Sequence, residues 1–347
     1  MDFIKESLKE LCSLMTVSGF EKKSRTRLFE IARQYFDEVS EDSFGNFVFV
    51  KKSLNNNAPR LMIDAHFDMV GMMVTDILEG GFLSVTNIGG LDTRILPSAE
   101  VTVYSKREIY GLISSIPPHL SKSGSKSSVP TLEELYIDTG YSVDELKELV
   151  PVGAPVVING EYTELQNGFV AAASLDDKAC VCAVFDAVRR ISAEELKYDI
   201  YVTVSAQEET GKCGAALSAC RIRPQMAIIT DVNFGAIEGD KDYDSIVCGK
   251  GASVDISALT DRKLTRGVMR LLDKEGVQYQ RICEPSYTYT NNDLVSVTGE
   301  GIPTVLMSIP LRSMHTPVET VCLKDIRSLA DILIRVAYTE KTDLEAI

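Results

Sequence analysis

The spacing of apolar residues predicts alternating helices and strands at both ends of the chain. Residues 2–15 carry apolar side chains at helical spacing, and Ser18-Gly19-Phe20-Glu21 is typical of a capping box that opens a second helix. Further helices are expected at 178–191, 261–275 and 323–338, and strands at 46–50, 60–65, 198–204, 226–230 and 304–309. This alternation predicts an α/β fold with a central mixed sheet flanked by helices.

The pattern changes between residues 70 and 163. Short apolar runs at 82–85, 100–104, 109–113 and 155–158 are separated by turn residues at close spacing, which is typical of a small β-barrel or sandwich. The polar stretch at 121–128 predicts a mobile loop within this unit. We therefore expect one discontinuous α/β domain, residues 1–69 and 164–347, that carries the chemistry and is interrupted by an inserted β-rich domain, residues 70–163.

Composition places the chain among ordinary globular proteins. At 347 residues the chain is long for one hydrophobic core. Apolar residues make up 45% of the sequence and charged residues 25%, as in ordinary soluble proteins. No apolar run reaches membrane-spanning length, and no basic segment followed by an apolar one opens the sequence, so we expect neither a membrane span nor a secretory signal. The eight scattered cysteines form no C-x-x-C pair, which favours reduced thiols and a cytoplasmic location.

The net charge narrows the range of partners. A formal charge of −14 argues against binding to nucleic acid or to an anionic membrane. It is consistent with attraction of metal ions or of a substrate that carries a free ammonium group. A solubilising role explains the same charge equally well.

Acidic residues and rare histidines stand where predicted strands end. Only three histidines occur in the chain, and two of them belong to this set. The five places are His66, Asp176-Asp177, Glu208-Glu209, Asp231 and His315. Because sites in open α/β sheets form beyond the carboxyl ends of the strands, these groups can converge on one edge.

Such a set has the composition of a two-metal site. Three carboxylates and two imidazoles can hold two divalent ions about 3.5–4 Å apart, and the small positive charge that remains favours a bridging hydroxide. Histidine with carboxylate suits zinc, cobalt or manganese. Asp68 lies two residues past His66 and can fix the tautomer of that ring. One member of the Glu208-Glu209 pair can bind metal while the other serves as a general base.

Each feature has a simpler explanation when it stands alone. A single H-x-D is common, adjacent acidic pairs usually lie in solvent, and His315 could be a buried structural histidine. However, Glu208-Glu209 follows an apolar strand and precedes Thr210-Gly211, and the features stand together at strand ends, which favours a metal site. The third histidine, His119, has no acidic neighbour in sequence, so we expect a structural or loop role for it.

Six blocks of residues resemble the TET-type aminopeptidases, a glutamyl-aminopeptidase-related family of dinuclear metallopeptidases. The blocks are 64–68 (DAHFD), 89–94 (GGLDTR), 117–120 (PPHL), 174–178 (SLDDK), 206–211 (AQEETG) and 308–319 (SIPLRSMHTPVE). They follow one another over nearly the whole chain, which makes the resemblance far more specific than any one block.

The resemblance implies a zinc-aminopeptidase-like sheet and a ligand set for two divalent ions per subunit. One ion would be held by His66, Asp176 and Asp231. The other would be held by Asp176, Glu209 and His315, so that Asp176 bridges the pair. Zinc is the expected metal, and cobalt and manganese are the alternatives.

The resemblance also implies a metal-dependent aminopeptidase that removes N-terminal residues from peptides. A hydroxide bridging the two metals would attack the scissile carbonyl, with Glu208 as general base and Asp68 orienting His66. Two other functions stay open. A glycoside hydrolase, a label attached to some relatives, needs a carboxyl pair and no metal, but the chain has no tryptophan for a sugar-stacking cleft. An inactive metal-binding assembly protein would have no need of Glu208.

The family's small β domain mediates dimerisation, so the resemblance implies the same role for residues 70–163. It implies a homo-oligomer built from dimers, with a tetrahedral dodecamer as one form. The chain departs from the family pattern at Met69, where an acidic residue is usual, and at Lys178, where an arginine is usual. It also has Asn291-Asn292-Asp293 where the family has Gly-Thr-Asp, which puts the specificity in doubt more than the chemistry.

Overall fold

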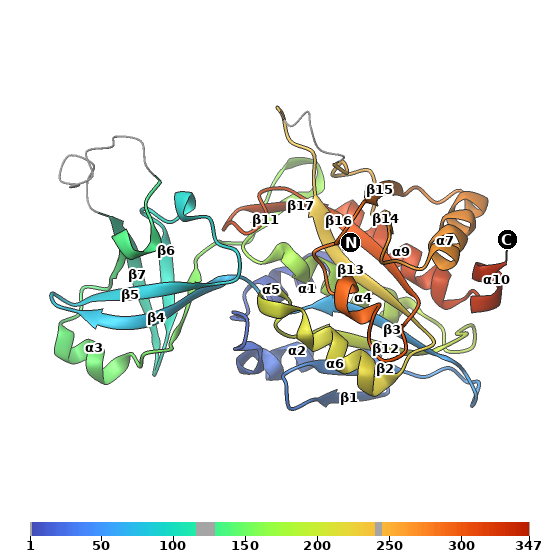
Figure 1. The fold of residues 1–347 in the computed structure, drawn as a ribbon, viewed down its shortest axis with the longest axis horizontal. Coiled ribbons are helices and arrows are strands. Elements are labelled where there is room, and N and C mark those ends of the chain that lie inside the picture. Colours follow the sequence, from blue (N-terminus) through green and yellow to red (C-terminus); the bar gives the residue numbers. More distant parts are fainter. Residues whose placement is uncertain (1, 116–128, 240–244, 347) are drawn as a thin grey trace.

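A mixed β-sheet forms the centre of the fold (Figure 1). The computed structural model describes residues 2–115, 129–239 and 245–346. Within these residues eight strands form the sheet, in the order β1 (Glu38–Glu41), β2 (Phe47–Lys51), β12 (Asp199–Ser205), β3 (Arg60–His66), β13 (Met226–Phe234), β16 (Thr304–Leu311), β14 (Ser253–Ser257) and β15 (Gln280–Glu284). The four neighbouring strands β12, β3, β13 and β16 run parallel to one another. Strand β2 pairs antiparallel with β12, and β14 pairs antiparallel with β16, so the predicted mixed sheet is confirmed.

The alternation of side chains along β3 decides what lies on each face of the sheet. Leu61, Ile63 and Ala65 belong to the main hydrophobic core, whereas Met62 packs in a smaller cluster on the opposite face. Because successive side chains of a strand point to opposite faces, Asp64 and His66 share the face of Met62. That face therefore becomes polar toward the carboxyl ends of the parallel strands.

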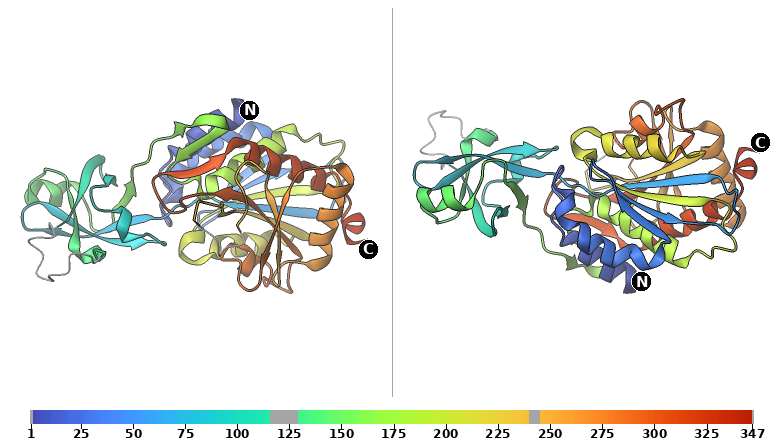
Figure 2. Two further views of the ribbon diagram at one scale, coloured as in Figure 1. Left: turned by 90° about the horizontal axis from the view of Figure 1, so that it is seen from above. Right: turned by 90° about the horizontal axis from the view of Figure 1, so that it is seen from below.

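Helices cover both faces of the sheet (Figure 2). The face with the main core is covered by α1 (Asp2–Cys12), α2 (Arg25–Ala32), α4 (Leu175–Arg190), α7 (Arg262–Glu275) and α9 (Leu323–Ala337), and the other face by α6 (Cys213–Ile222) and α8 (Asn292–Val295). Two further short helices are α5 (Glu208–Gly211) and α10 (Lys341–Glu345). Among the described residues, no helix has both the length and the apolar character that crossing a membrane requires.

Local sequence signals explain where α7 begins and ends. The side chain of Asp261 accepts hydrogen bonds from the backbone N–H groups of Lys263 and Leu264, and so caps the first turn. The helix ends at Glu275, and the next residue, Gly276, adopts the left-handed conformation with φ +65°, where a side chain would be strained. The predicted end of this helix is therefore confirmed, and its start lies one residue later than predicted.

The chain that follows β3 forms a closed β-barrel beside the central sheet (Figure 1). Its strands follow the order β4 (Gly71–Leu78), β5 (Phe82–Ile88), β8 (Leu135–Asp138), β7 (Glu108–Ser115), β6 (Glu100–Tyr104) and β9 (Pro155–Ile158). Inward-facing side chains of these strands, with Leu146 of α3 (Val143–Leu149), make a hydrophobic core of their own. The sequence predicts β6 and β9 with these bounds, but neither β8 nor α3.

A small three-stranded sheet lies between the barrel and α4. It consists of β10 (Thr163–Glu164), β11 (Phe169–Ala172) and β17 (Glu319–Cys322). The strand that precedes Asp176 is therefore β11, which pairs with β17 and not with a strand of the central sheet.

Two local predictions differ from the structure. A 3-10 helix (Glu21–Ser24) begins after Phe20 and no side chain caps it, so the capping box predicted at Ser18-Gly19-Phe20-Glu21 is wrong. The strand predicted at 226–230 extends to Phe234, so Asp231 lies inside β13 and does not follow it. His119 and the loop predicted at 121–128 lie outside the described residues.

Candidate functional site

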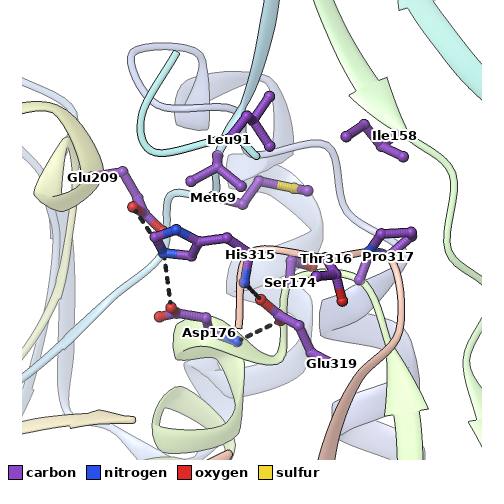
Figure 3. A pocket seen from close by; sticks show the side chains of 12 residues that line it. Met69, Leu91, Ile158, Ser174, Asp176, Glu209, His315, Thr316, Pro317 and Glu319 are labelled. Atoms are coloured by element: carbon purple, nitrogen blue, oxygen red, sulfur yellow. Dashed lines mark hydrogen bonds and ion pairs between the residues drawn. The ribbon is translucent and has the colours of Figure 1, made fainter. Parts of the chain in front are cut away.

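Asp176 stands between two histidines. It lies in the first turn of α4, and the peptide bond that joins it to Asp177 is cis. One carboxylate oxygen, Oδ1, is 3.0 Å from Nε2 of His66. The other, Oδ2, is 3.4 Å from Nε2 of His315. A dashed line marks this contact in Figure 3. The two oxygens of one carboxylate thus face two separate imidazoles.

The first imidazole belongs to a group with Asp176 and Asp231. His66 is the last residue of β3, and Asp231 lies in the neighbouring parallel strand β13. Asp231 Oδ1 is 3.8 Å from His66 Nε2, and all three side chains are buried. Their potential ligand atoms lie within 4.8 Å of one another, a compact arrangement that suits one metal ion.

The second imidazole belongs to a group with Asp176 and Glu209. Glu209 lies in α5, which follows β12, and its Oε2 is 3.4 Å from Nε2 of His315. His315 follows β16 and has a φ of +60°, a conformation that residues other than glycine rarely adopt. Such conformations concentrate at functional sites. The potential ligand atoms of this group also lie within 4.8 Å of one another.

Both imidazoles are oriented by backbone carbonyl groups. Nδ1 of His66 is 3.0 Å from the carbonyl oxygen of Asp68, and Nδ1 of His315 is 2.9 Å from that of Gly90. A carbonyl oxygen can only accept, so each Nδ1 donates its hydrogen. In the neutral ring Nε2 then offers its lone pair toward Asp176, which is the tautomer that a metal ligand needs.

The carboxylate of Asp68 is engaged with α5. Its Oδ1 and Oδ2 accept hydrogen bonds from the backbone N–H groups of Glu208 and Glu209, at 2.9 and 3.0 Å. Oδ1 is 3.6 Å from Nδ1 of His66, beyond hydrogen-bond distance. The geometry therefore ties Asp68 to the segment that carries the acidic pair, and ties His66 to the backbone of Asp68.

Glu208 is the acidic neighbour that belongs to neither ligand group. It is 8% exposed, and its Oε1 is buried without a hydrogen-bond partner among the described residues. Burial, followed by the nearby carboxylates of Glu209, Asp68 and Asp176, raises the pKa of Glu208 to about 8, although His66 lowers it. An uncommitted carboxylate beside two ligand groups can exchange a proton with a bound molecule.

Glu319 supports both ligand groups, a role that its sequence pattern alone does not predict. It is 2% exposed at the start of β17 and accepts hydrogen bonds from two backbone N–H groups, that of Asp176 at 3.1 Å and that of His315 at 2.7 Å (Figure 3). Burial raises its pKa to about 8, and Asp176 adds to the effect. The sequence signals for this residue are its position four residues after His315 and its place at the end of the family-like block 308–319.

The charges of the site favour the binding of cations. Burial raises the pKa of Asp231 well above its usual range, because an uncompensated carboxylate is costly to bury. Burial lowers the pKa of His315, but contacts with Asp176 and Glu209 outweigh it and raise the pKa to about 11. Both shifts favour the protonated forms of these side chains, so the site attracts positive charge. Imidazole nitrogens and carboxylate oxygens are ligands of zinc and similar ions, so the residues fit divalent metals.

The positions that depart from the family pattern lie close to this site. Met69 lines a hollow beside the second ligand group. The ammonium of Lys178, fully buried in α4, donates to the hydroxyl oxygen of Ser174 at 2.9 Å and to the carbonyl oxygen of Leu14 at 3.0 Å. Asn291 Nδ2 donates to Asp64 Oδ2 at 2.8 Å, beneath the site on the same face of the sheet. None of these three side chains belongs to a ligand group.

A hollow adjoins the second ligand group (Figure 3). Asp176, Glu209 and His315 form its polar side. Its apolar lining comes from both structural units, and includes Met69, Leu91, Ile158 and Pro317. A bound molecule can therefore place a polar centre at the ligand groups while its apolar part packs against the barrel segment.

This arrangement of strands, barrel and acidic residues matches known proteins over nearly the whole chain. The model of the M42 glutamyl aminopeptidase family matches residues 45–332. The chain belongs to this family. Among characterised relatives, it is 30% identical to lysyl aminopeptidase from Pyrococcus furiosus, over 92% of this chain and 93% of the relative.

Solved structures of M42 relatives have the same fold. An aminopeptidase from the archaeon Desulfurococcus kamchatkensis is 28% identical, with a TM-score of 0.91 over 99% of this chain and 96% of that one. The TET1 peptidase of Pyrococcus horikoshii, described as assembling into a tetrahedron or a large octahedral shell, is 28% identical, with a TM-score of 0.84 over 97% and 100%. The chain is therefore a peptide-hydrolysing enzyme of an aminopeptidase family, and neither the glycoside hydrolase nor the inactive assembly protein is favoured.

Proposed function

We propose that this aminopeptidase works with two divalent ions. His66, Asp176 and Asp231 would hold one ion, and Asp176, Glu209 and His315 the other. The single observation that carries the proposal is the position of Asp176, because its two carboxylate oxygens face two different histidines. Zinc is the metal that we expect, with cobalt or manganese as alternatives, because all three accept this mixture of ligands.

The ions and the protein have different tasks in this proposal. When bound, the ions supply Lewis acidity, which polarises the scissile carbonyl and makes a water molecule a stronger acid. Glu208 accepts the proton of the attacking water and later donates it to the nitrogen of the leaving amine. Its Oε1, which is buried and free of hydrogen bonds to the described residues, is available for this transfer.

Other residues keep this arrangement in place. The carbonyl groups of Asp68 and Gly90 hold the two rings with Nε2 toward the centre. The carboxylate of Asp68 holds the backbone of Glu208 and Glu209, so a shift of Asp68 would move both. Glu319 holds Asp176 and His315. Because Asp68 and Glu319 are buried, they hold the reacting groups in place before a substrate arrives.

The substrate is a peptide with a free N-terminus. Its ammonium group would approach the ions and the acidic side chains around them, and its carbonyl would lie between the ions and Glu208. The negative charge of the chain favours this approach.

We also propose an oligomer and a domain division. Residues 1–69 and 164–347 would form the catalytic domain, and residues 70–163 the domain that mediates dimerisation. The assembly described for the TET1 peptidase supports a homo-oligomer, with a tetrahedral dodecamer as one form. A cytoplasmic location agrees with the cysteines of the described residues, which form no disulfide.

The test of this function is a panel of aminoacyl-anilides assayed before and after chelation. Activity should disappear with the chelator and return when zinc, cobalt or manganese is added. The same samples should release nothing from a β-glucan before or after metal is added. Hydrolysis of the anilides that persists in fully metal-free protein would contradict the proposal.

A further inference from the structure

The segment that follows α1 contacts the segment that carries the proposed base. Ser18 Oγ lies 2.9 Å from Thr210 Oγ1, and Glu21 Oε1 accepts a hydrogen bond from the backbone N–H of Gln207 at 3.1 Å. The same oxygen accepts a hydrogen bond from the backbone N–H of Gly19 at 2.9 Å, so Glu21 also bonds within its own loop. Ser18 and Glu21, which resemble a capping box in the sequence, thus bond across the fold to residues on either side of Glu208.

Residues 206–209, which we call the acidic segment, donate their four backbone N–H groups to buried side chains. The acceptors are Asn46 Oδ1 for Ala206 at 2.9 Å, Glu21 Oε1 for Gln207 at 3.1 Å, Asp68 Oδ1 for Glu208 at 2.9 Å and Asp68 Oδ2 for Glu209 at 3.0 Å. The three accepting residues are at most 2% exposed. Every N–H from the end of β12 to the metal-ligand candidate Glu209 is therefore fixed by a side chain from elsewhere in the chain.

The backbone needs such support at this place. Gln207 has a φ of +57°, which non-glycine residues rarely adopt, and it separates the end of β12 from the short helix α5. A turn of this kind has few regular backbone hydrogen bonds, so its N–H groups depend on side-chain acceptors. Glu21 supplies the acceptor for the residue directly before Glu208.

A carboxylate is an energetically unfavourable acceptor for this buried contact. Glu21 is 2% exposed, and no ion pair joins it to a cation among the described residues. Burial, and then the nearby Asp68 carboxylate, raises the pKa of Glu21 to about 7. A buried acid without a counter-charge costs stability, which suggests that the contact serves something other than stability.

We propose that Glu21 is a positioning residue for the peptidase reaction, which sets the direction of the Glu208 carboxylate through the backbone N–H of Gln207. This inference rests on the proposed role of Glu208 as the base. Glu21 contacts neither ligand group of the site, so it acts only through the acidic segment. Displacements of about 1 Å at reacting groups can lower rates about a hundredfold.

The experiment compares E21A, which removes the acceptor, with E21Q, whose amide oxygen still accepts from Gln207 and Gly19. In E21A we expect kcat to fall about 10- to 100-fold, with KM within about twofold of the wild type, because the substrate contacts are unchanged. In E21Q we expect kcat within about threefold of the wild type. Metal content, measured on each purified variant, should stay at the wild-type value because no ligand is removed.

Asp325 provides a matched control for the loss of a buried acid. It is 0% exposed, accepts hydrogen bonds from the backbone N–H groups of Gly249 at 2.6 Å and Gly251 at 2.7 Å, and belongs to neither ligand group. D325A should lower the Tm and leave kcat unchanged. If D325A loses as much kcat as E21A at an equal loss of Tm, or if E21Q is as impaired as E21A, the proposal is overturned.

Two further variants keep the outcome decisive. If E21A does not fold, E21D takes its place, because it keeps the charge but withdraws the oxygen from Gln207; wild-type kcat in that variant overturns the inference. E208Q is measured in parallel. An active E208Q contradicts the proposed function itself, whereas an inactive E208Q beside a fully active E21A contradicts only the role of Glu21.

Discussion

The ring of His315 is bonded to the barrel segment of the chain, because its Nδ1 lies 2.9 Å from the carbonyl oxygen of Gly90. His315 follows β16 of the central sheet, whereas Gly90 follows β5 of the barrel. One half of the proposed metal centre thus depends on the inserted unit. Glycine suits this position, since a Cβ at Gly90 would lie only 3.3 Å from the His315 ring.

Adding that Cβ should weaken one metal site. In G90A we expect the ring of His315 to be displaced and the affinity for one of the two ions to fall about 10-fold, as for other groups that orient ligands. Calorimetric titration of metal-free protein with zinc measures this directly. G211A is the control, because a Cβ at Gly211 makes only an ordinary contact of 3.7 Å. Equal zinc affinities in G90A and the wild type would contradict the prediction.

The role of Glu208 in catalysis should be separable from metal binding. E208Q keeps the shape of the side chain but cannot accept a proton, so we expect kcat to fall about 10²- to 10⁴-fold. Zinc content should remain at the wild-type value, because Glu208 belongs to neither ligand group. Steady-state kinetics and metal analysis on the same sample provide both readouts. Turnover close to that of the wild type would remove Glu208 from the mechanism.

Much of this site could be predicted from the sequence because its ligands follow strong patterns. Apolar runs mark β3, β12, β13 and β16, and in parallel strands the carboxyl ends lie at one edge. His66 and Glu209 could therefore be assigned to one edge without coordinates. The position of Asp231 inside β13 changes only the length of the strand.

The supporting residues could not be predicted, because their partners are distant in sequence. Glu21 and Gln207 are 186 residues apart, and Glu319 and Asp176 are 143 apart. Locally, Ser18-Gly19-Phe20-Glu21 has the composition of a capping box, and only the fold shows that its polar atoms bond elsewhere. A short motif is a guide to structure only when its partners lie within the motif.

The pH dependence of stability should reveal the buried acids. Burial raises the pKa of Glu208 and Glu319 from 4.5 to about 8, and that of Asp64 from 3.8 to about 7. The folded metal-free protein then holds more protons than the unfolded chain between about pH 5 and pH 8. Its stability should be greatest at the acidic end of this range and should fall as the pH rises through these values. The pKa of Asp176 is lowered instead, so its opposite effect falls below this range.

Bound metal should reverse this trend. Cations favour the ionised carboxylates, and ligands must lose protons to bind, so zinc binding should release protons and tighten as the pH rises. The Tm of metal-free and zinc-loaded protein, measured from about pH 5 to pH 8, should therefore diverge. Titrations in buffers with different ionisation enthalpies count the released protons. A Tm of the metal-free protein that rises with pH would contradict the assignment.

Glu319 should control both halves of the metal centre. Its two oxygens accept the N–H groups of Asp176 and His315, and Asp176 belongs to both ligand groups. In E319Q the amide NH₂ would face one of these N–H donors, so one of the two bonds is lost. We expect the affinity for zinc to fall about 10- to 100-fold. E164Q is the control, because Glu164 is exposed and pairs with Lys5. If saturation with zinc restores wild-type kcat in E319Q, Glu319 acts through the affinity for metal. An affinity of E319Q for zinc equal to that of the wild type would show that Glu319 does not hold the ligands.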